Sequence, residues 1–209
     1  MGRSFRTADR FLLAAWAASL LGGLGALIHH GTTPGAVGDV PEAMPEALGQ
    51  RLGAEDGRPL VVLCAHPQCP CLPSTLTELQ RVLATAPAHR IGILAYTPEA
   101  TVAGWDAERT ATLREALPTA RLVPDHGGRL AKQLGAQTSG HVLVYGADGS
   151  LRFSGGVTAG RGHVGDNAGA RAFARAVAGS SDPRETTHIF GCPLDADTGN
   201  DGNRGSDSF

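Results

Sequence analysis

The order of apolar runs and helical patterns between residues 58 and 179 constrains the fold more than any other feature of the chain. Residues 58–66 form a short continuous apolar run, typical of a buried strand, and residues 72–86 have the apolar spacing of a helix. The alternation continues with strand 89–97, helix 106–117, edge strand 120–125, helix 127–136, a strand pair within 141–157 and helix 167–179. This order predicts an α/β fold with a mixed central sheet and helices on both faces.

The N-terminus carries an uncharged apolar run, Phe11 to Ile28, preceded by Arg3, Arg6 and Arg10. The run has about the length that a helix needs to cross a bilayer, and the arginines are expected to stay on the cytoplasmic side. It is longer than a usual signal-peptide core, and no small-residue cleavage site follows it directly, so an uncleaved signal anchor is favoured over a cleaved signal peptide. Either interpretation exports the rest of the chain to the periplasmic or extracellular side, where disulfides persist.

The remaining boundaries follow from composition. We expect the N-terminal transmembrane helix at 1–30, a Gly- and Pro-rich linker at 31–45, the folded domain at 46–194, and a disordered tail at 195–209 that is polar and nearly devoid of apolar residues. The formal net charge is −2, and the folded part has no cluster of Lys and Arg. Nucleic acid is therefore not expected as a partner.

Three of the four cysteines lie within eight positions. Cys69 and Cys71 stand on either side of Pro70, and Cys64 lies just upstream in the first strand. A redox pair, a metal site and a structural staple are the alternatives. A disulfide between Cys69 and Cys71 would close a very small ring, which constrains the unfolded chain little and is readily reduced, so the pattern favours exchange over stapling. Pro70 fixes φ near −65° and would supply part of the bend.

The strand, the "HPQCPC" turn and the following helix resemble the redox turn of the thioredoxin-like superfamily. The run from 123 to 157 is similar to the second half of its membrane-anchored, exported TlpA/ResA-like branch, and the stretches "HPQCPC", "TSGHVLVY", "GRGHVGDN" and "FGCPL" are similar to its RedB-type group. The resemblance covers residues 58 to 179. It implies a thioredoxin-like fold and a thiol–disulfide oxidoreductase, with Cys69 as the nucleophile and Cys71 as its resolving partner. The helix N-terminus lowers the pKa of such a thiol.

Two departures from that family stand out. Its members usually place two residues between the cysteines, whereas here there is only Pro70. They also have a cis-proline at the start of the first hairpin strand, and that position falls on Gly140. Glycine allows a close backbone approach to sulfur but does not favour a cis bend.

The loop "GRGHVGDN" is expected to emerge near Cys69, because the second hairpin strand returns to that end of the sheet. Arg161 and His163 would there favour a thiolate, and Asp166 would orient His163 or carry a proton. The alternative is a glycine-rich loop in which Asp166 and Asn167 merely cap the last helix. His66 is expected near the cysteines through chain proximity.

The distant Cys192 is a possible third thiol that folds back to the redox turn, or it forms a plain bridge with Cys64. A buried free thiol is the commoner state for a cysteine within a strand such as Cys64. The sequence leaves these alternatives open.

No nucleotide or flavin motif appears, so the expected partners are protein thiols and disulfides together with a membrane-bound or exported electron donor. The alternative function is a copper- or zinc-binding, metal-delivery module without redox turnover. For it the resemblance implies Cys69, Cys71 and His163 as ligands, and soft thiolates would select Cu(I) or Zn. A degenerate interaction domain that keeps the fold without turnover is a third alternative.

Overall fold

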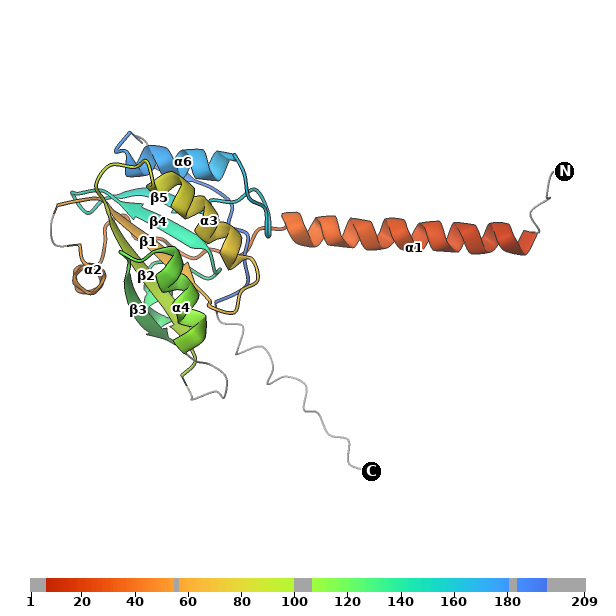
Figure 1. Ribbon diagram of the computed structural model, residues 1–209, viewed down its shortest axis with the longest axis horizontal. Helices are drawn as coiled ribbons and strands as arrows, with labels where there is room; N and C mark the ends of the chain where they lie inside the picture. The colour runs from red at the N-terminus through yellow and green to blue at the C-terminus, as the bar shows by residue number, and fades with distance from the viewer. Residues whose placement is uncertain (1–6, 55–56, 100–106, 181–183, 195–209) are drawn as a thin grey trace, which may run out of the picture.

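Six strands form one sheet in the order β3-β2-β1-β4-β5-β6, and a long helix projects from it (Figure 1). The computed structural model describes residues 7–54, 57–99, 107–180 and 184–194. The elements are α1 (Thr7–Thr32), α2 (Glu46–Leu52), β1 (Leu60–Ala65), α3 (Leu72–Leu83), β2 (Arg90–Thr97), α4 (Ala107–Ala116), β3 (Arg121–His126), α5 (Arg129–Gln133), β4 (His141–Tyr145), β5 (Leu151–Gly155), α6 (Ala168–Val177) and β6 (Glu185–Thr186).

The sheet is mixed. Strands β1, β2 and β3 are parallel, β4 is antiparallel to β1, and β5 is antiparallel to β4. The edge strand β6 pairs with β5 in parallel. A β-α-β unit followed by a β-hairpin and a helix, with the hairpin beside β1, is the thioredoxin-like arrangement. The predicted fold class is therefore confirmed.

Helices cover both faces of the sheet. Helices α3, α4 and α6 pack on one face, with Leu79, Leu113 and Phe173 at the centre of that core. The other face is covered by α2 and α5, through residues such as Leu52 and Ala131. Successive side chains of a strand point to opposite faces, so β1 sends Leu63 to the first core and Cys64 to the second. This alternation decides which cysteines can meet.

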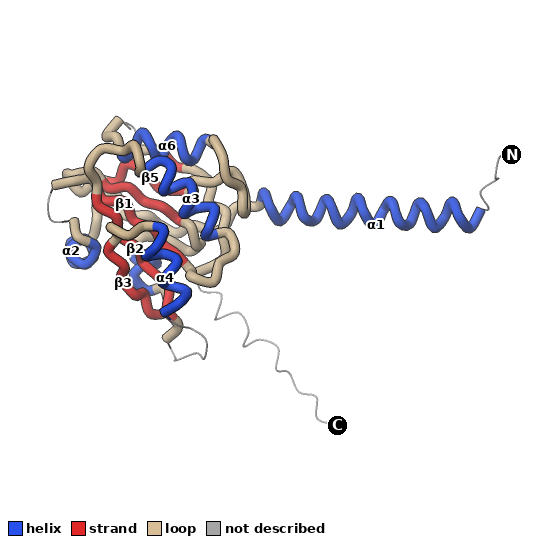
Figure 2. The backbone as a smooth tube through the Cα atoms, in the orientation of Figure 1, coloured by secondary structure: helices blue, strands red, loops and turns tan. Residues whose placement is uncertain are grey.

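Helix α1 stands away from the domain (Figure 2). Its stretch from Asp9 to Thr32 has a mean hydropathy of 2.0, and none of its apolar window is buried. It is thus long and apolar enough to be a membrane anchor or a signal sequence. Residues 33–45 lie along the domain: the N–H of Gly35 donates to the carbonyl of Ile189, and Val37 forms a β-bridge with Ala136. The tail 195–209, predicted to be disordered, lies outside the described residues.

Candidate functional site

The Cys-Pro-Cys stretch forms a hydrogen-bonded turn at the start of α3. The N–H of Leu72 donates to the carbonyl of Cys69 over 3.1 Å, which places Pro70 second and Cys71 third in the turn. Cys71 has φ −85° and ψ −14°, close to the values of the third residue of a type I turn, and proline is favoured at the second position. Cys71 is also the residue that precedes the first turn of the helix. The turn therefore holds both cysteines at the α3 N-terminus.

A second turn with proline in the same position comes immediately before it. The N–H of Cys69 donates to the carbonyl of His66 over 2.9 Å, and Pro67 follows His66. The His66 ring is buried and stacks on Tyr96, with ring centroids 4.9 Å apart. The backbone of His66 thus shapes the cysteine turn, while its ring packs on a residue of the second core.

Cys192 lies directly against Cys69. The two sulfurs are 3.0 Å apart, and the backbone N–H of Cys192 donates to the Cys69 sulfur over 3.4 Å. The chain around Cys192 is held in β fashion, because Pro193 forms an antiparallel bridge with Thr138 and the N–H of Ser139 donates to the carbonyl of Cys192 over 2.8 Å. All four cysteines are free thiols.

Two residues just before β4 complete this side of the site. Gly140 has φ +87°, a conformation that glycine adopts readily, and its N–H donates to the carbonyl of Cys64 over 2.9 Å. A Cβ on Gly140 would lie 3.1 Å from the hydroxyl of Thr75 in α3, so glycine allows this close approach. The buried hydroxyl of Ser139 accepts the N–H of His66 and also hydrogen-bonds Cys69. Sequence reasoning missed Ser139, although its neighbour Gly140 had been singled out.

The three clustered thiols differ in acidity. Burial raises the pKa of Cys69, but hydrogen bonds from the Cys192 thiol and N–H, the Cys71 N–H and the Ser139 hydroxyl outweigh burial and lower the pKa overall. Burial and the neighbouring Cys69 charge raise the pKa of Cys71, although Arg161 opposes them. Burial, followed by the hydrogen bond to Cys69, raises the pKa of Cys192 to about 12. Cys69 is therefore the thiol that ionises first.

Arg161 joins the site to the end of α1. Its backbone N–H donates to the carbonyl of Gly31 and its Nε to that of His30, both over 3.0 Å, and its Nη1 donates to the carbonyl of Gly191. The guanidinium also favours the thiolate of Cys71. These contacts agree with the expected place of Arg161 near the thiols. Arg161 also stabilises the end of α1, because a cation favours the last carbonyls of a helix.

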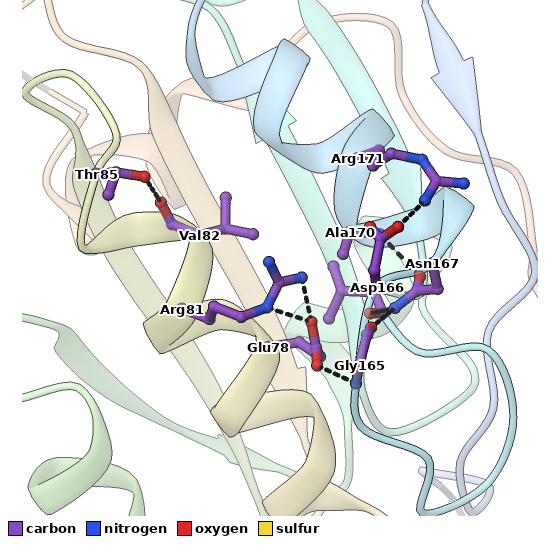
Figure 3. A network of polar contacts seen from close by, with 10 residues as sticks. Glu78, Arg81, Val82, Thr85, Gly165, Asp166, Asn167, Ala170 and Arg171 are labelled. Atoms are coloured by element: carbon purple, nitrogen blue, oxygen red, sulfur yellow. Dashed lines mark hydrogen bonds and ion pairs between the residues drawn. The ribbon is translucent and has the colours of Figure 1, made fainter.

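The other two charged residues of this loop point elsewhere. Asp166 forms an exposed ion pair with Arg171 of α6, and the Nδ1 atom of the exposed His163 contacts the carbonyl of Arg161 (Figure 3 shows the Asp166 pair). The prediction that Asp166 orients His163 is not supported, because each side chain already has a different partner.

A buried carboxylate, Glu78, fixes the same loop to α3. Its Oε1 accepts the N–H of Gly165 over 2.7 Å, and its Oε2 accepts two donors of Arg81 (Figure 3). The Glu78 side chain is fully buried, so both oxygens need these partners. The loop that carries Arg161 is thereby held in place from one side.

Cys64 is separated from the other thiols by the sheet. Its side chain lies in the second core, whereas Cys69 belongs to the first core and Cys192 packs against it. Burial, and then the charge of Asp125, raise the pKa of Cys64. The predicted alternative of a bridge between Cys64 and Cys192 is wrong, because the two side chains pack on opposite sides of the sheet and both thiols are free. Cys64 is a buried packing residue.

The alternative metal-ligand set is not assembled. In the part of the chain that the structure describes, no three His, Cys, Asp or Glu side chains are grouped closely enough to hold a metal ion. His163, the distant ligand of that set, is engaged with the backbone of its own loop instead. The described site is thus the Cys69–Cys192 thiol pair, with Cys71 next to it in the turn and Arg161 beside it.

Comparison with known proteins agrees with the fold. No protein-family model and no curated protein matches the chain. A hypothetical protein from Sinorhizobium meliloti aligns with a TM-score of 0.56 at 16% identity, over 78% of this chain and 94% of that one. An uncharacterized conserved protein from Geobacillus kaustophilus gives 0.54 at 14% identity, over 78% and 89%. At these identities the similarity concerns the fold alone.

A secreted disulfide oxidoreductase of Mycobacterium tuberculosis aligns with a TM-score of 0.38 at 20% identity, over 47% of this chain and 69% of that one.

Proposed function

We propose that this chain is an exported, membrane-anchored thiol–disulfide oxidoreductase that acts on protein disulfides with Cys69 as its nucleophile. The observation that carries the proposal is the position of the Cys69 sulfur at the N-terminus of α3, 3.0 Å from a second thiol. A thiol whose pKa is lowered and which has another sulfur within reach has both properties that reversible exchange needs.

The reaction is a transfer of two electrons. The Cys69 thiolate attacks one sulfur of a partner disulfide, a mixed disulfide forms, and the other partner sulfur leaves as a thiolate that takes up a proton. A second thiol of the site then loses its proton and attacks the Cys69 sulfur, which releases the second partner thiol. The partner is reduced to two thiols, and the site is oxidised to a disulfide. Cys71 is the resolving thiol that the Cys-Pro-Cys spacing predicts.

The cellular setting is part of the proposal. We place the domain on the periplasmic or extracellular side, with α1 as a signal anchor, in line with the resemblance to the TlpA/ResA-like and RedB-type group. The positive residues Arg3, Arg6 and Arg10 before the apolar run support this orientation. A membrane-bound or exported dithiol protein would return the site to its reduced form.

The test is a redox titration of the full-length protein in detergent. The protein is equilibrated in buffers of reduced and oxidised glutathione, and free thiols are then alkylated and counted by mass. A reversible loss of two thiols that disappears in Cys69→Ser supports the proposal. Cys64→Ala is the matched control, because Cys64 lies in the other core and its removal leaves the titration unchanged. Stoichiometric binding of Cu(I) or Zn without any reversible thiol loss would favour the metal-delivery alternative.

A further inference from the structure

We propose that Cys192 is the resolving thiol of the site, and that residues 191–194, the Cys192 segment, form a tethered strand that covers Cys69 until a partner peptide replaces it. This inference deepens the proposed function, since it names the sulfur that closes the reaction and the way a partner reaches Cys69. Two thiols of the described chain adjoin Cys69, and the geometry selects between them.

The backbone geometry favours Cys192 over Cys71. The sulfurs of Cys192 and Cys69 are 3.0 Å apart, so the Cys69–Cys192 bond needs little change of the backbone once the segment has returned to Cys69. Cys71 belongs to the same tight turn as Cys69, with only Pro70 between them. Joining them would close a small ring across a residue whose φ is fixed, which strains the bond. The loop closed by Cys69 and Cys192 spans most of the domain and imposes no such local strain.

The Cys192 segment pairs with residues 137–139 in the way that an added β-strand pairs with the edge of a sheet. The N–H of Ser139 donates to the carbonyl of Cys192 over 2.8 Å, and the N–H of Leu194 donates to that of Gln137 over 2.9 Å. These two bonds flank the bridge between Pro193 and Thr138. Addition of an extended segment to an exposed backbone edge is a general way of holding a peptide while a neighbouring pocket selects a side chain. Here the selected side chain is a cysteine.

One end of the segment is anchored by a buried side chain, and the cysteine end is held by hydrogen bonds. Leu194 is buried in the second core, whereas Cys192 is only partly buried and Pro193 is exposed. A cavity of about 320 Å³ adjoins the segment and is lined by Gly35, Arg161 and Pro193 among others. Once its hydrogen bonds to Ser139 and Cys69 break, Cys192 can leave while Leu194 remains anchored, and the vacated backbone at Thr138 and Ser139 then accepts a cysteine-bearing peptide of a partner.

A glycine makes the close approach possible. A Cβ on Gly191 would lie 1.9 Å from the carbonyl oxygen of Ser139, so no other residue fits there without moving the segment. The Arg161 guanidinium also donates to the carbonyl of Gly191. Gly191→Ala is thus a variant that displaces Cys192 and leaves every sulfur in the protein.

The electrons balance within the site. After Cys69 has attacked a partner disulfide, Cys192 gives up its proton and attacks the Cys69 sulfur; the Cys69–Cys192 bond forms, the bond from Cys69 to the partner breaks, and the partner leaves as a thiolate that takes up a proton. Cys71 stays reduced throughout.

Disulfide mapping tests the bond. Full-length protein in detergent is oxidised with diamide, alkylated and cut with trypsin, which leaves Cys64, Cys69 and Cys71 together in peptide 52–81 and Cys192 in peptide 185–204. A disulfide that links the two peptides in the wild type and in Cys71→Ser, and is lost in Cys192→Ser, supports the proposal. A disulfide confined to peptide 52–81 overturns it. Gly191→Ala is expected to slow the linkage several-fold, while Gly25→Ala, with open space around it, leaves the rate unchanged.

Resolution is tested with oxidised glutathione as the disulfide. Cys192→Ser, and Cys192→Ala as a second variant, are expected to accumulate a glutathione adduct on Cys69, whereas Cys71→Ser releases it as the wild type does. Accumulation in Cys71→Ser, or release from both Cys192 variants, overturns the proposal. If no variant reacts with any disulfide, the proposed function fails, and the diamide map alone decides whether Cys192 pairs with Cys69.

Discussion

At the scale of single residues, the acidity of Cys69 depends on donors from its own turn and from two distant parts of the chain. Cys71 follows it in the turn, Ser139 lies before β4, and Cys192 comes from beyond α6. Each contributes a hydrogen bond to the sulfur, and such bonds favour a thiolate over a thiol. The site therefore gains its reactive group only when the whole domain is folded.

We expect Cys69 to alkylate at lower pH than an ordinary thiol. Because its pKa is lowered in the folded state, its thiolate forms below the usual value of about 8.5. The lowered pKa also makes ionised Cys69 stabilise the folded state. This contribution to the free energy of unfolding is complete above the pKa of the unfolded thiol, and it is lost as the pH falls through the pKa of the folded protein. Iodoacetamide rates followed by mass from pH 5 to 10 give the profile. If the rate for Cys69 rose at a higher pH than the rates for Cys71 and Cys192, Cys69 would not be the most acidic thiol of the site.

Removal of the Cys192 donor is expected to raise the pKa of Cys69. Alanine at position 192 keeps the backbone N–H that donates to the sulfur but loses the side-chain donor, whereas serine keeps a hydroxyl that can still donate. The alkylation profile of Cys69 should therefore move to higher pH in Cys192→Ala and move less in Cys192→Ser. Equal profiles for both variants and the wild type would show that Cys192 does not stabilise the thiolate.

The sequence could locate Cys69, Cys71 and Arg161 because each follows from local order: a turn before a helix, and a loop after the returning strand of a hairpin. It could not place Ser139, whose role depends on a contact with residues more than 60 positions away. The sequence also left two partners open for Cys192, namely Cys69 and Cys64. These two cysteines lie in different cores, and only the folded sheet shows which of the two cores Cys192 contacts.

At the scale of elements, two turns in succession and one buried carboxylate position the site. The turns have proline second in each case, and they deliver Cys69 and Cys71 to the start of α3. Glu78, in the middle of α3, then fixes the loop that carries Arg161 through the N–H of Gly165. The helix that presents the thiols thus also holds the arginine beside them.

Loss of the Glu78 carboxylate is expected to destabilise the domain. Glu78→Ala removes the hydrogen bond from Gly165 to a carboxylate, and such bonds to charged groups contribute roughly 1.5–3 kcal/mol, whereas Glu78→Gln keeps an acceptor and costs less. Denaturant unfolding monitored by circular dichroism measures the difference. Arg171→Ala is the control in the same region, because its ion pair with Asp166 is exposed and contributes about 0–1 kcal/mol. A smaller effect for Glu78→Ala than for Arg171→Ala would contradict the assigned role.

Most elements of the sheet and its helices could be predicted because apolar periodicity marks them strongly. The predicted helix 127–136 is shorter in the structure and ends at Gln133, since Gly135 takes φ +67° and the chain turns there. The two-residue strand β6 was not predicted, because Glu185 and Thr186 carry no apolar pattern and pair only through the sheet edge.

At the scale of the whole molecule, α1 and the thiol site are neighbours. Arg161 hydrogen-bonds the last carbonyls of α1 and also Gly191, which precedes Cys192. The residues after α1 join the domain at once, since the N–H of Gly35 is bonded to Ile189. The predicted linker therefore adds little separation between the helix and the site.

We expect the full-length protein to remain in the membrane. After a carbonate wash it should stay in the membrane fraction at its full mass, and a variant that begins at residue 33 should be released. A β-lactamase fused after Leu194 should protect cells against ampicillin if the domain is exported. A processed form that has lost residues 1–30 would show that α1 is a cleaved signal peptide.

The short connection between α1 and the domain limits where the thiols can travel. Only Thr33 and Pro34 separate the end of α1 from Gly35. With α1 in a bilayer, the domain that carries Cys69 is held close to the membrane surface. Its encounters with membrane-bound partners are then collisions by lateral diffusion, and their rate follows how densely those partners populate the surface.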